Sequence, residues 1–403
     1  MAALVVVAAV AIAGAVRVMT VTVPSLTATR VLAGSVTIPG SAPRVAWPKQ
    51  GQAAGEVLGI GGIGSSGSAG SPQPIASLAK VMTAYVVLHD HPLSSGQSGF
   101  NVTIAAADVA DYQNRLAQAQ SVMPVAEGEQ LTELQLLQGL LVASANNVGP
   151  ILAKYDAGSE AKFVTKMNTT ARGLGMTRTT YTDASGFNST TVSTATDQLV
   201  LADRAMVIPV FAKIVGMSSV DLPVAGTVSN FDRAVGNHGF VGIKTGSDSS
   251  AGGCFMFANR QTIAGHPITV VGVLLGLDRG ETSTDALISA SIQAATAIVD
   301  SVARGVGVHT VVPAGATVET VTNAQGHKVA ATTTRSLTQV GWGGQTFQLL
   351  VTTVPLGRSL KAGQDVATVG FTGGPGPDTA ETSAAATSSM PPVSWSWRLR
   401  HAL

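Results

Sequence analysis

The sequence contains little cysteine, few aromatic residues and little charge. Its single cysteine, Cys254, excludes any disulfide bond within the chain, and the apolar residues around it indicate a buried, unreactive thiol. Charged residues make up 12% of the chain, about half the usual share, and the formal net charge is +1. A chain so close to neutral has no electrostatic reason to bind nucleic acid or an anionic membrane surface, so no nucleic-acid partner is expected.

Apolar residues, in contrast, are abundant. They fill 45% of the 403 positions, enough for a sizeable core, and the length predicts two domains with flanking segments. Residues 2–16 form an apolar run without a preceding Lys or Arg. The run is shorter than the roughly 20 residues that span a bilayer, but it suits a signal peptide, and Ala13-Gly14-Ala15 resembles a cleavage site. We expect residues 1–16 to direct export, as a cleaved signal peptide or a retained anchor; the alternative is a buried core segment. Residues 17–48 are expected to form a linker.

The first candidate site is Ser77-Leu78-Ala79-Lys80, which follows Pro72 and Pro74 and opens an apolar run of helical length. Positions i and i+3 of a helix share one face, so the hydroxyl and the amine are expected within reach of each other. A serine nucleophile needs an adjacent base, and a lysine can be that base once burial makes it neutral. Backbone N–H groups at the helix start could stabilise an oxyanion. The same pattern also fits a solvated first turn.

Two further polar clusters lie at the ends of apolar elements. Ser144 and Asn146 follow a predicted helix that opens with a capping box at Thr132 and Gln135. Burying these polar side chains costs free energy unless they are hydrogen-bonded, which favours a functional role. The alternative is a helix C-cap, a position that Asn suits. Lys244-Thr245-Gly246-Ser247 lies in the first of three strand-like runs that indicate an antiparallel meander. The cation of Lys244 and the hydroxyl of Thr245 suit binding of a carboxylate, and Gly246 lets a ligand backbone approach the strand closely. The alternative is that these polar residues only discourage strand pairing at the edge of the sheet.

These clusters follow the order S-x-x-K, S-x-N, K-T-G, the motif set of penicillin-binding proteins and class A β-lactamases. Residues 74–83, 144–147 and 242–254 resemble the low-molecular-mass D-alanyl-D-alanine carboxypeptidases, which are serine-type penicillin-binding proteins. The resemblance implies an α+β fold of the β-lactamase/transpeptidase type over residues 49–305, with an antiparallel sheet flanked by helices. It implies no cofactor and no metal.

The implied activity is removal of the terminal D-alanine from peptidoglycan stem peptides that end in D-Ala-D-Ala, through an acyl-enzyme that β-lactam antibiotics also form. In that reaction Ser77 would be acylated and Lys80 would be its base. Ser144 and Asn146 would relay protons and hold the substrate amide. Such an enzyme would be exported, and would act in the cell wall or at the outer face of the cytoplasmic membrane.

The third motif would bind the end of the substrate. Lys244 and Thr245 would hold its terminal carboxylate, and the backbone N–H of Ser247, beyond Gly246, would complete the oxyanion hole with that of the nucleophile. In the family an arginine beyond this motif assists carboxylate binding, and Arg279 is the best-placed candidate.

Two alternative functions share these residues. One is a serine β-lactamase, which needs a base for deacylation; class A enzymes use a glutamate in an E-x-x-L-N segment for this purpose. Glu160 is the only glutamate between residues 147 and 242, and no L-N follows it. Ala145, where the β-lactamase motif has aspartate, also argues against this alternative. The other alternative is a catalytically silent wall-binding module that uses the same cleft.

The last hundred residues have a different pattern. Short strand-like runs between turn residues predict a small β-rich C-terminal domain over residues 308–371. Residues 372–403 are rich in Gly, Pro, Thr and Ser at first, and are expected to be a disordered tail. Because the tail ends with two Trp and two Arg, membrane contact at the termini is a further expectation.

Overall fold

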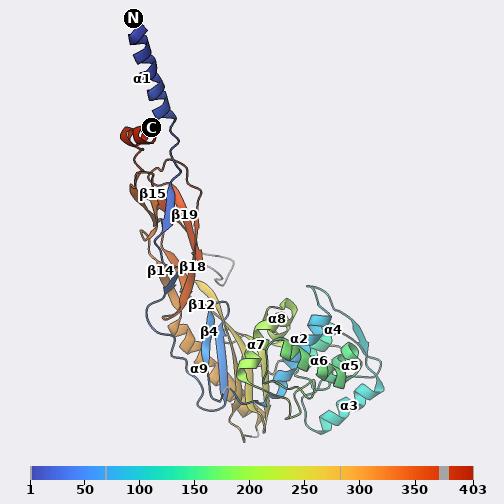
Figure 1. The fold of residues 1–403 in the computed structure, drawn as a ribbon. Coiled ribbons are helices and arrows are strands. Elements are labelled where there is room, and N and C mark those ends of the chain that lie inside the picture. The colour runs from blue at the N-terminus through green and yellow to red at the C-terminus, as the bar shows by residue number, and fades with distance from the viewer. Residues whose placement is uncertain (1, 69, 282, 372–380, 403) are drawn as a thin grey trace. The chain divides into compact units, whose positions relative to one another are not determined.

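The computed structural model describes residues 2–68, 70–281, 283–371 and 381–402, and the chain divides into two compact units (Figure 1). One unit is Pro43–Val306. The other joins the residues up to Ala42 with those from Gly307 onward. The second unit is therefore built from both ends of the chain.

The Pro43–Val306 unit is organised around a five-stranded antiparallel sheet with the order β11-β12-β13-β3-β4. The three long strands form the meander that the Gly-rich turns predict, and the two shorter ones form a hairpin beside it. The strands are β3 (Gln52–Val57), β4 (Gly61–Ser66), β11 (Phe240–Asp248), β12 (Gly252–Ile263) and β13 (His266–Leu277). Cys254 of β12 is buried, as its apolar neighbours predict.

Helices cover both faces of this sheet (Figure 1). One face packs against α9 (Thr284–Gly305), and the other against α7 (Ala195–Met206) and α8 (Pro209–Val215). Among the described residues, α9 is long and apolar enough to cross a membrane, with 44% of its apolar window buried inside the fold, and Val6–Thr20 is a shorter apolar helix. The length and composition of α9 are therefore explained by its place in the core.

A helical layer completes the unit around α2 (Ala79–Asp90), whose residues Val81, Met82, Ala84 and Val87 are all 0% exposed. A helix that is apolar on nearly every side belongs in a protein core. Around it lie α4 (Glu133–Leu141), α5 (Val148–Ala157) and α6 (Glu160–Gly173), with α3 (Ala106–Ala117) on the outside. The predicted capping box is confirmed, because Thr132 Oγ1 accepts from Gln135 N while Gln135 Oε1 accepts from Thr132 N.

The second unit contains a seven-stranded sheet with the order β1-β15-β16-β20-β19-β18-β2 and a two-stranded sheet, β14-β17. The strand-like runs predicted after residue 308 are all present, and β17 is an addition to them. The strands are β1 (Thr27–Arg30), β2 (Ser35–Thr37), β14 (Gly307–Val312), β15 (Thr317–Thr322), β16 (Lys328–Thr333), β17 (Leu337–Gly341), β18 (Thr346–Thr353), β19 (Asp365–Phe371) and β20 (Thr382–Ala386).

Two predictions for this unit are wrong. Residues 17–48 are not simply a linker, because β1 and β2 form the two edges of the large sheet. The predicted tail, residues 372–403, is not disordered throughout: β20 inserts between β16 and β19, and a helix follows it. Short strands of Thr, Ser and Ala have the composition of a linker, and only pairing with distant strands makes them part of a sheet. Residues 372–380 lie outside the described part of the chain.

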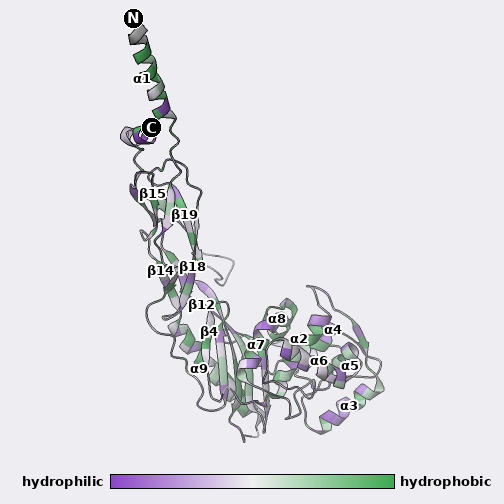
Figure 2. Cartoon of the chain, viewed as in Figure 1, coloured by the Kyte–Doolittle hydropathy of each residue, from purple (hydrophilic) through white to green (hydrophobic). Residues whose placement is uncertain are grey.

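The apolar N-terminal run forms α1 (Ala2–Thr20), and the C-terminal helix α10 (Trp395–Ala402) packs against it. The helix continues beyond the predicted end at residue 16, where Thr20 Oγ1 donates to the Val16 carbonyl. Figure 2 shows that α1 is hydrophobic along most of its length. Its described apolar side chains are largely exposed, with Val7 and Val10 both at 68%.

Candidate active site

The Ser77 hydroxyl and the Lys80 amine lie in direct contact. Ser77 belongs to a short 3₁₀ turn, Ala76–Leu78, that leads into α2, and Lys80 lies in the first turn of that helix. Lys80 Nζ donates a 2.8 Å hydrogen bond to Ser77 Oγ. The i, i+3 spacing therefore brings the two side chains together as predicted, although the first turn is 3₁₀ rather than α.

Lys80 is 0% exposed, which is rare for a lysine. Its second acceptor is the Ser185 carbonyl, also at 2.8 Å. Burial lowers the pKa of Lys80 well below its ordinary value, the nearby Lys244 lowers it further, and the Asp183 carboxylate opposes the shift. A neutral amine in contact with a serine hydroxyl can accept the hydroxyl proton, so the pair is built for nucleophilic catalysis.

The second motif lies in the turn between α4 and α5. Ser144 has a φ of +54°, a strained value for a residue with a side chain, and strain of this kind clusters at functional sites. Asn146 Nδ2 donates to Gln120 Oε1 at 2.8 Å, while Asn146 Oδ1 has no partner among the described residues. The buried amide thus keeps one acceptor available for a ligand.

The third motif lies on β11, next to the nucleophile. A Cβ added to Gly246 would lie 3.0 Å from Ser77 N, so the glycine allows β11 to pass close to the 3₁₀ turn. The sequence predicted this glycine to admit a ligand backbone; its close neighbour in the structure is the nucleophile's own backbone. Lys244 is 1% exposed and donates to the Thr245 carbonyl. Burial lowers the pKa of Lys244 to about 8, against the opposing charge of Asp232.

A cavity of about 220 Å³ brings the three motifs together. Its lining includes six of the nine predicted site residues: Ser77, Ser144, Asn146, Thr245, Gly246 and Ser247. Lys80 and Lys244 are buried and do not belong to this lining. Arg279 is not in the lining, and its guanidinium hydrogen-bonds to Gln73. Among the described residues, including those of the cavity, no group of three His, Cys, Asp or Glu side chains could hold a metal ion.

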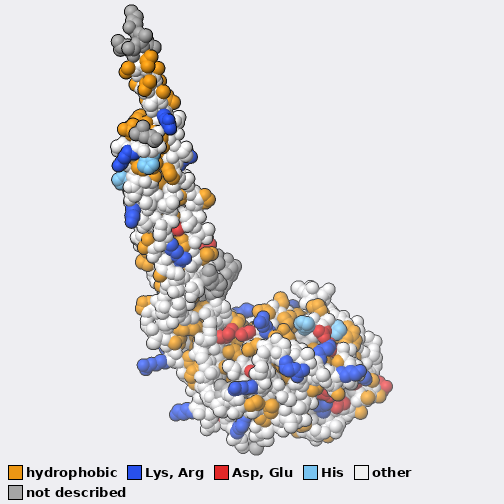
Figure 3. All heavy atoms as spheres, in the orientation of Figure 1, with side chains coloured by type: hydrophobic (Ala, Val, Ile, Leu, Met, Phe, Trp, Pro, Cys, Tyr) orange, Lys and Arg blue, Asp and Glu red, His pale blue; other side chains and the backbone are white. Residues whose placement is uncertain are grey.

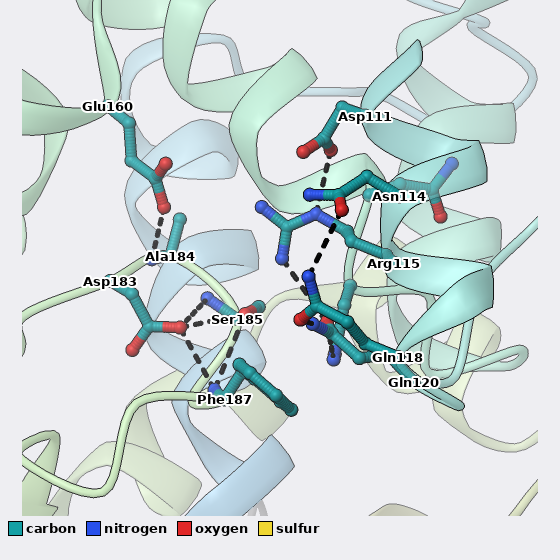
Figure 4. A network of polar contacts seen from close by, with 12 residues as sticks. Asp111, Asn114, Arg115, Gln118, Gln120, Glu160, Asp183, Ala184, Ser185 and Phe187 are labelled. Atoms are coloured by element: carbon teal, nitrogen blue, oxygen red, sulfur yellow. Dashed lines mark hydrogen bonds and ion pairs between the residues drawn. The ribbon is translucent and has the colours of Figure 1, made fainter. Parts of the chain in front are cut away.

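Sequence analysis missed several residues that line or support this cavity. Gln120, Phe187 and Phe231 contribute to the lining. Asp183 and Arg115 act electrostatically on the buried Lys80, and both belong to the polar network around Gln120 and Phe187 in Figure 4. None of these belongs to one of the three motifs. The only local signal is the Asp–x–Ser–Gly sequence beginning at Asp183, which is typical of a tight turn.

The sequence model of the D-alanyl-D-alanine carboxypeptidase family matches residues 61–275, more than half of the chain. The chain belongs to the D-alanyl-D-alanine carboxypeptidase family. Among its relatives is D-alanyl-D-alanine carboxypeptidase DacB2 of Mycobacterium tuberculosis, which is 32% identical over 252 residues, or 61% of this chain and 79% of the relative. This carboxypeptidase is therefore a serine-type peptidase and a penicillin-binding hydrolase of peptidoglycan, as the motifs imply.

Solved structures show the same fold. The crystal structure of a Streptomyces DD-transpeptidase has a TM-score of 0.52 and 27% identity, and covers 66% of this carboxypeptidase and 98% of that chain. A peptidoglycan synthesis regulatory factor from Streptococcus pneumoniae covers 86% of this chain and 100% of its own, with a TM-score of 0.59 and 20% identity. The predicted α+β fold with a β-rich C-terminal region is thus confirmed.

Proposed function

We propose specific roles for the residues of this serine D-Ala-D-Ala carboxypeptidase, beginning with the nucleophile. The observation that carries the proposal is the 2.8 Å contact between Ser77 Oγ and the buried Lys80 Nζ. Lys80 takes the hydroxyl proton as Ser77 attacks the carbonyl of the penultimate D-alanine. The terminal D-alanine leaves with a proton on its amine, and water then hydrolyses the Ser77 ester.

The other motif residues bind the substrate and its developing charge. The N–H groups of Ser77 and Ser247 face the oxyanion, and Ser144 relays the proton that Lys80 has taken to the leaving amine. Asn146 Oδ1, which has no partner among the described residues, accepts from a substrate amide. Lys244 and Thr245 bind the terminal carboxylate. Arg279 would bind the carboxylate with them only if its guanidinium gave up the hydrogen bond to Gln73.

Penicillin labelling tests the nucleophile. Ser77→Ala should abolish both covalent labelling and D-alanine release from a diacyl-Lys-D-Ala-D-Ala peptide. Lys80→Ala should slow labelling by several orders of magnitude, because members of a nucleophile–base unit fail together. Ser250→Ala, in the exposed turn after β11, is a matched control that should behave as wild type. An adduct found by mass spectrometry on another serine would contradict the assignment.

Peptidoglycan lies outside the cytoplasm, and so does the site of action of this family. We propose further that α1 is a retained anchor and that α10 lies at the outer face of the membrane. The residues of the candidate cleavage site support this, because Gly14 and Ala15 form a small pocket with Trp395 and Leu399 of α10. Arg398 donates to the Met19 carbonyl. Basic side chains gather at the C-terminal helix below the apolar α1, an arrangement that suits a membrane interface (Figure 3).

Fractionation of the exported protein tests this location. The full chain should pellet with membranes and begin upstream of Ala13. A mature protein that begins after Ala15 would contradict retention, and a full chain that stays soluble would contradict the anchor. Trp395→Ala with Leu399→Ala should leave the chain in the pellet while making α10 more accessible to protease.

A further inference from the structure

The Ser185 carbonyl is the second acceptor for Lys80 Nζ, and it belongs to a short segment, 183–187, that none of the three motifs contains. Ala184, Ser185 and Gly186 are buried, and Phe187 lines the active-site cavity. The position of Lys80 Nζ beside Ser77 therefore depends on how this segment is held.

Asp183 closes the segment into a turn. Its Oδ2 accepts from Ser185 Oγ at 2.7 Å, from Phe187 N at 2.9 Å and from Ser185 N at 3.3 Å (Figure 4). Its Oδ1 accepts from Thr191 Oγ1 at 2.6 Å. Charge-assisted hydrogen bonds of this kind are among the stronger ones in proteins. One carboxylate thus fixes the turn that carries the lysine's acceptor.

Neighbouring elements hold the same segment from the other side. Glu160 Oε1 accepts from Ala184 N at 3.0 Å, and Thr83 Oγ1 of α2 donates to the Ala184 carbonyl at 2.7 Å. Gly186 has a φ of +78°, and an added Cβ would lie 1.9 Å from the Ala76 carbonyl oxygen. Only glycine lets the segment come this close to the turn that carries the nucleophile.

Three charged groups act on Lys80 from the elements around it. Lys244 of β11 and Arg115 of α3 lower the pKa of Lys80, whereas Asp183 raises it. Asp183 is the only acid among these three, so its charge opposes the two cations. Glu160, in contrast, holds the segment without a comparable electrostatic effect on Lys80.

We propose that Asp183 is a positioning residue for acylation, which holds the Ser185 carbonyl so that Lys80 Nζ stays beside Ser77 Oγ. Its charge also delays the loss of the lysine proton as pH rises. The proposal rests on the proposed role of Lys80 as base, and extends it to a residue outside the three motifs.

The test is the second-order rate of acylation by a fluorescent penicillin, measured between pH 5 and pH 10. Asp183→Asn keeps the size of the side chain and one acceptor oxygen, replaces the other oxygen with an amide donor, and removes the charge. Since the carboxylate raises the lysine pKa, the acidic limb of the profile should move to lower pH. Glu160→Gln, the matched control on the same segment, should leave the limb at its wild-type pH. If the acidic limb of the pH profile does not move in Asp183→Asn, the proposed effect of the Asp183 charge on Lys80 is wrong.

Ser185→Ala tests the positioning part without changing any charge. It removes the hydroxyl that Asp183 holds but keeps the backbone carbonyl, and should lower the plateau rate about two- to tenfold with no shift of the limb. A wild-type plateau in a folded Ser185→Ala variant would overturn positioning. If Lys80→Ala acylates at the wild-type rate, the proposed base is wrong. If Lys80→Ala is inactive while the Asp183 and Ser185 variants match wild type, only the present inference fails.

Discussion

Gln120 Oε1 accepts hydrogen bonds from Asn146 Nδ2 at 2.8 Å and from Arg115 Nη1 at 3.3 Å. This amide oxygen fixes which way the Asn146 side chain faces. Arg115 is held in turn by Asp111, whose Oδ2 accepts from Nε at 2.7 Å. Gln120, in the segment after α3, thus orients Asn146 of the second motif, in the turn between α4 and α5.

Replacing Gln120 should therefore impair catalysis through Asn146. Gln120→Ala leaves a buried donor unpaired, which costs about 1–3 kcal/mol, so kcat/KM for a D-Ala-D-Ala peptide should fall roughly five- to hundredfold. Gln120→Glu keeps the acceptor oxygen and should retain most of the activity. An equal loss of kcat/KM in Gln120→Ala and Gln120→Glu would contradict the role of the Gln120 oxygen as the acceptor for Asn146.

Carboxylate recognition by Lys244 should depend on pH. A lysine is charged below its pKa, and burial lowers the pKa of Lys244 to about 8 rather than its ordinary 10.5. Above pH 8 the cation is lost, so kcat/KM for a peptide with a free C-terminal carboxylate should fall about tenfold or more by pH 10. With the acidic limb from Lys80, the profile should be bell-shaped.

Two comparisons check this assignment. A peptide amidated at its last residue should lack the extra fall above pH 8, and should react on the order of ten- to a hundredfold more slowly at pH 7. Asp232→Asn removes the charge that opposes the shift, so the basic limb should move to lower pH. Turnover of the amidated peptide at the rate of the free acid would contradict the role of Lys244.

The penicilloyl ester should be long-lived. Glu160 Oε1 is occupied by Ala184 N, and the one acid in the described lining of the cavity, Asp248, accepts from Ser250 N and Ala251 N. No glutamate is in the described lining of the cavity to activate water as in class A β-lactamases, so acylation should be fast and deacylation slow. We expect an adduct that survives for minutes or longer by mass spectrometry, with negligible nitrocefin turnover. Sustained hydrolysis at many turnovers per second would favour the β-lactamase alternative.

Stability should depend on pH through Asp203 of α7. Burial and contact with Glu56 of β3 raise the pKa of Asp203 to about 8. Between about pH 4 and pH 8 the folded protein keeps a proton that the unfolded chain has lost, so rising pH lowers the free energy of unfolding. Asp203→Asn should remove this loss, and gain about 1–2 kcal/mol at pH 8.5 after allowance for partial exposure, with little change at pH 5.

Urea denaturation at both pH values measures this effect. Asp221→Asn, at an exposed site whose carboxylate bonds to Thr227, is the matched control and should show no such difference between the two pH values. The same pH trend in wild type and in Asp203→Asn would exclude Asp203 as its source.

The nucleophile and its base could be predicted because their relation is local. The i, i+3 spacing over one turn places Ser77 and Lys80 on the same face, within reach of each other. The meander of β11, β12 and β13 was predictable for a similar reason, because each strand is followed by a Gly-rich turn and pairs with its neighbour in sequence.

Gln120 and Asp183 could not be found in the same way. Each acts through a hydrogen bond to a group that the fold brings near it, and nothing in the surrounding sequence indicates that group. Arg279, chosen from its position in the sequence, lies outside the described lining of the cavity and hydrogen-bonds to Gln73, so its role in carboxylate binding stays a prediction. The strand β1 was missed because its partner β15 lies far away in the sequence. The strand β20 was missed because a short run of Thr, Ser and Ala has the composition of a linker.

The order of strands in the seven-stranded sheet has a consequence for how the protein is made. Two strands precede the Pro43–Val306 unit and five follow it, and β20, which is synthesised last among them, lies in the middle. Until β20 leaves the ribosome, β16 and β19 have no strand between them, and β1 must wait for a partner almost three hundred residues later. Since contacts that distant form slowly, the peptidase unit should reach its native state while the sheet is still incomplete.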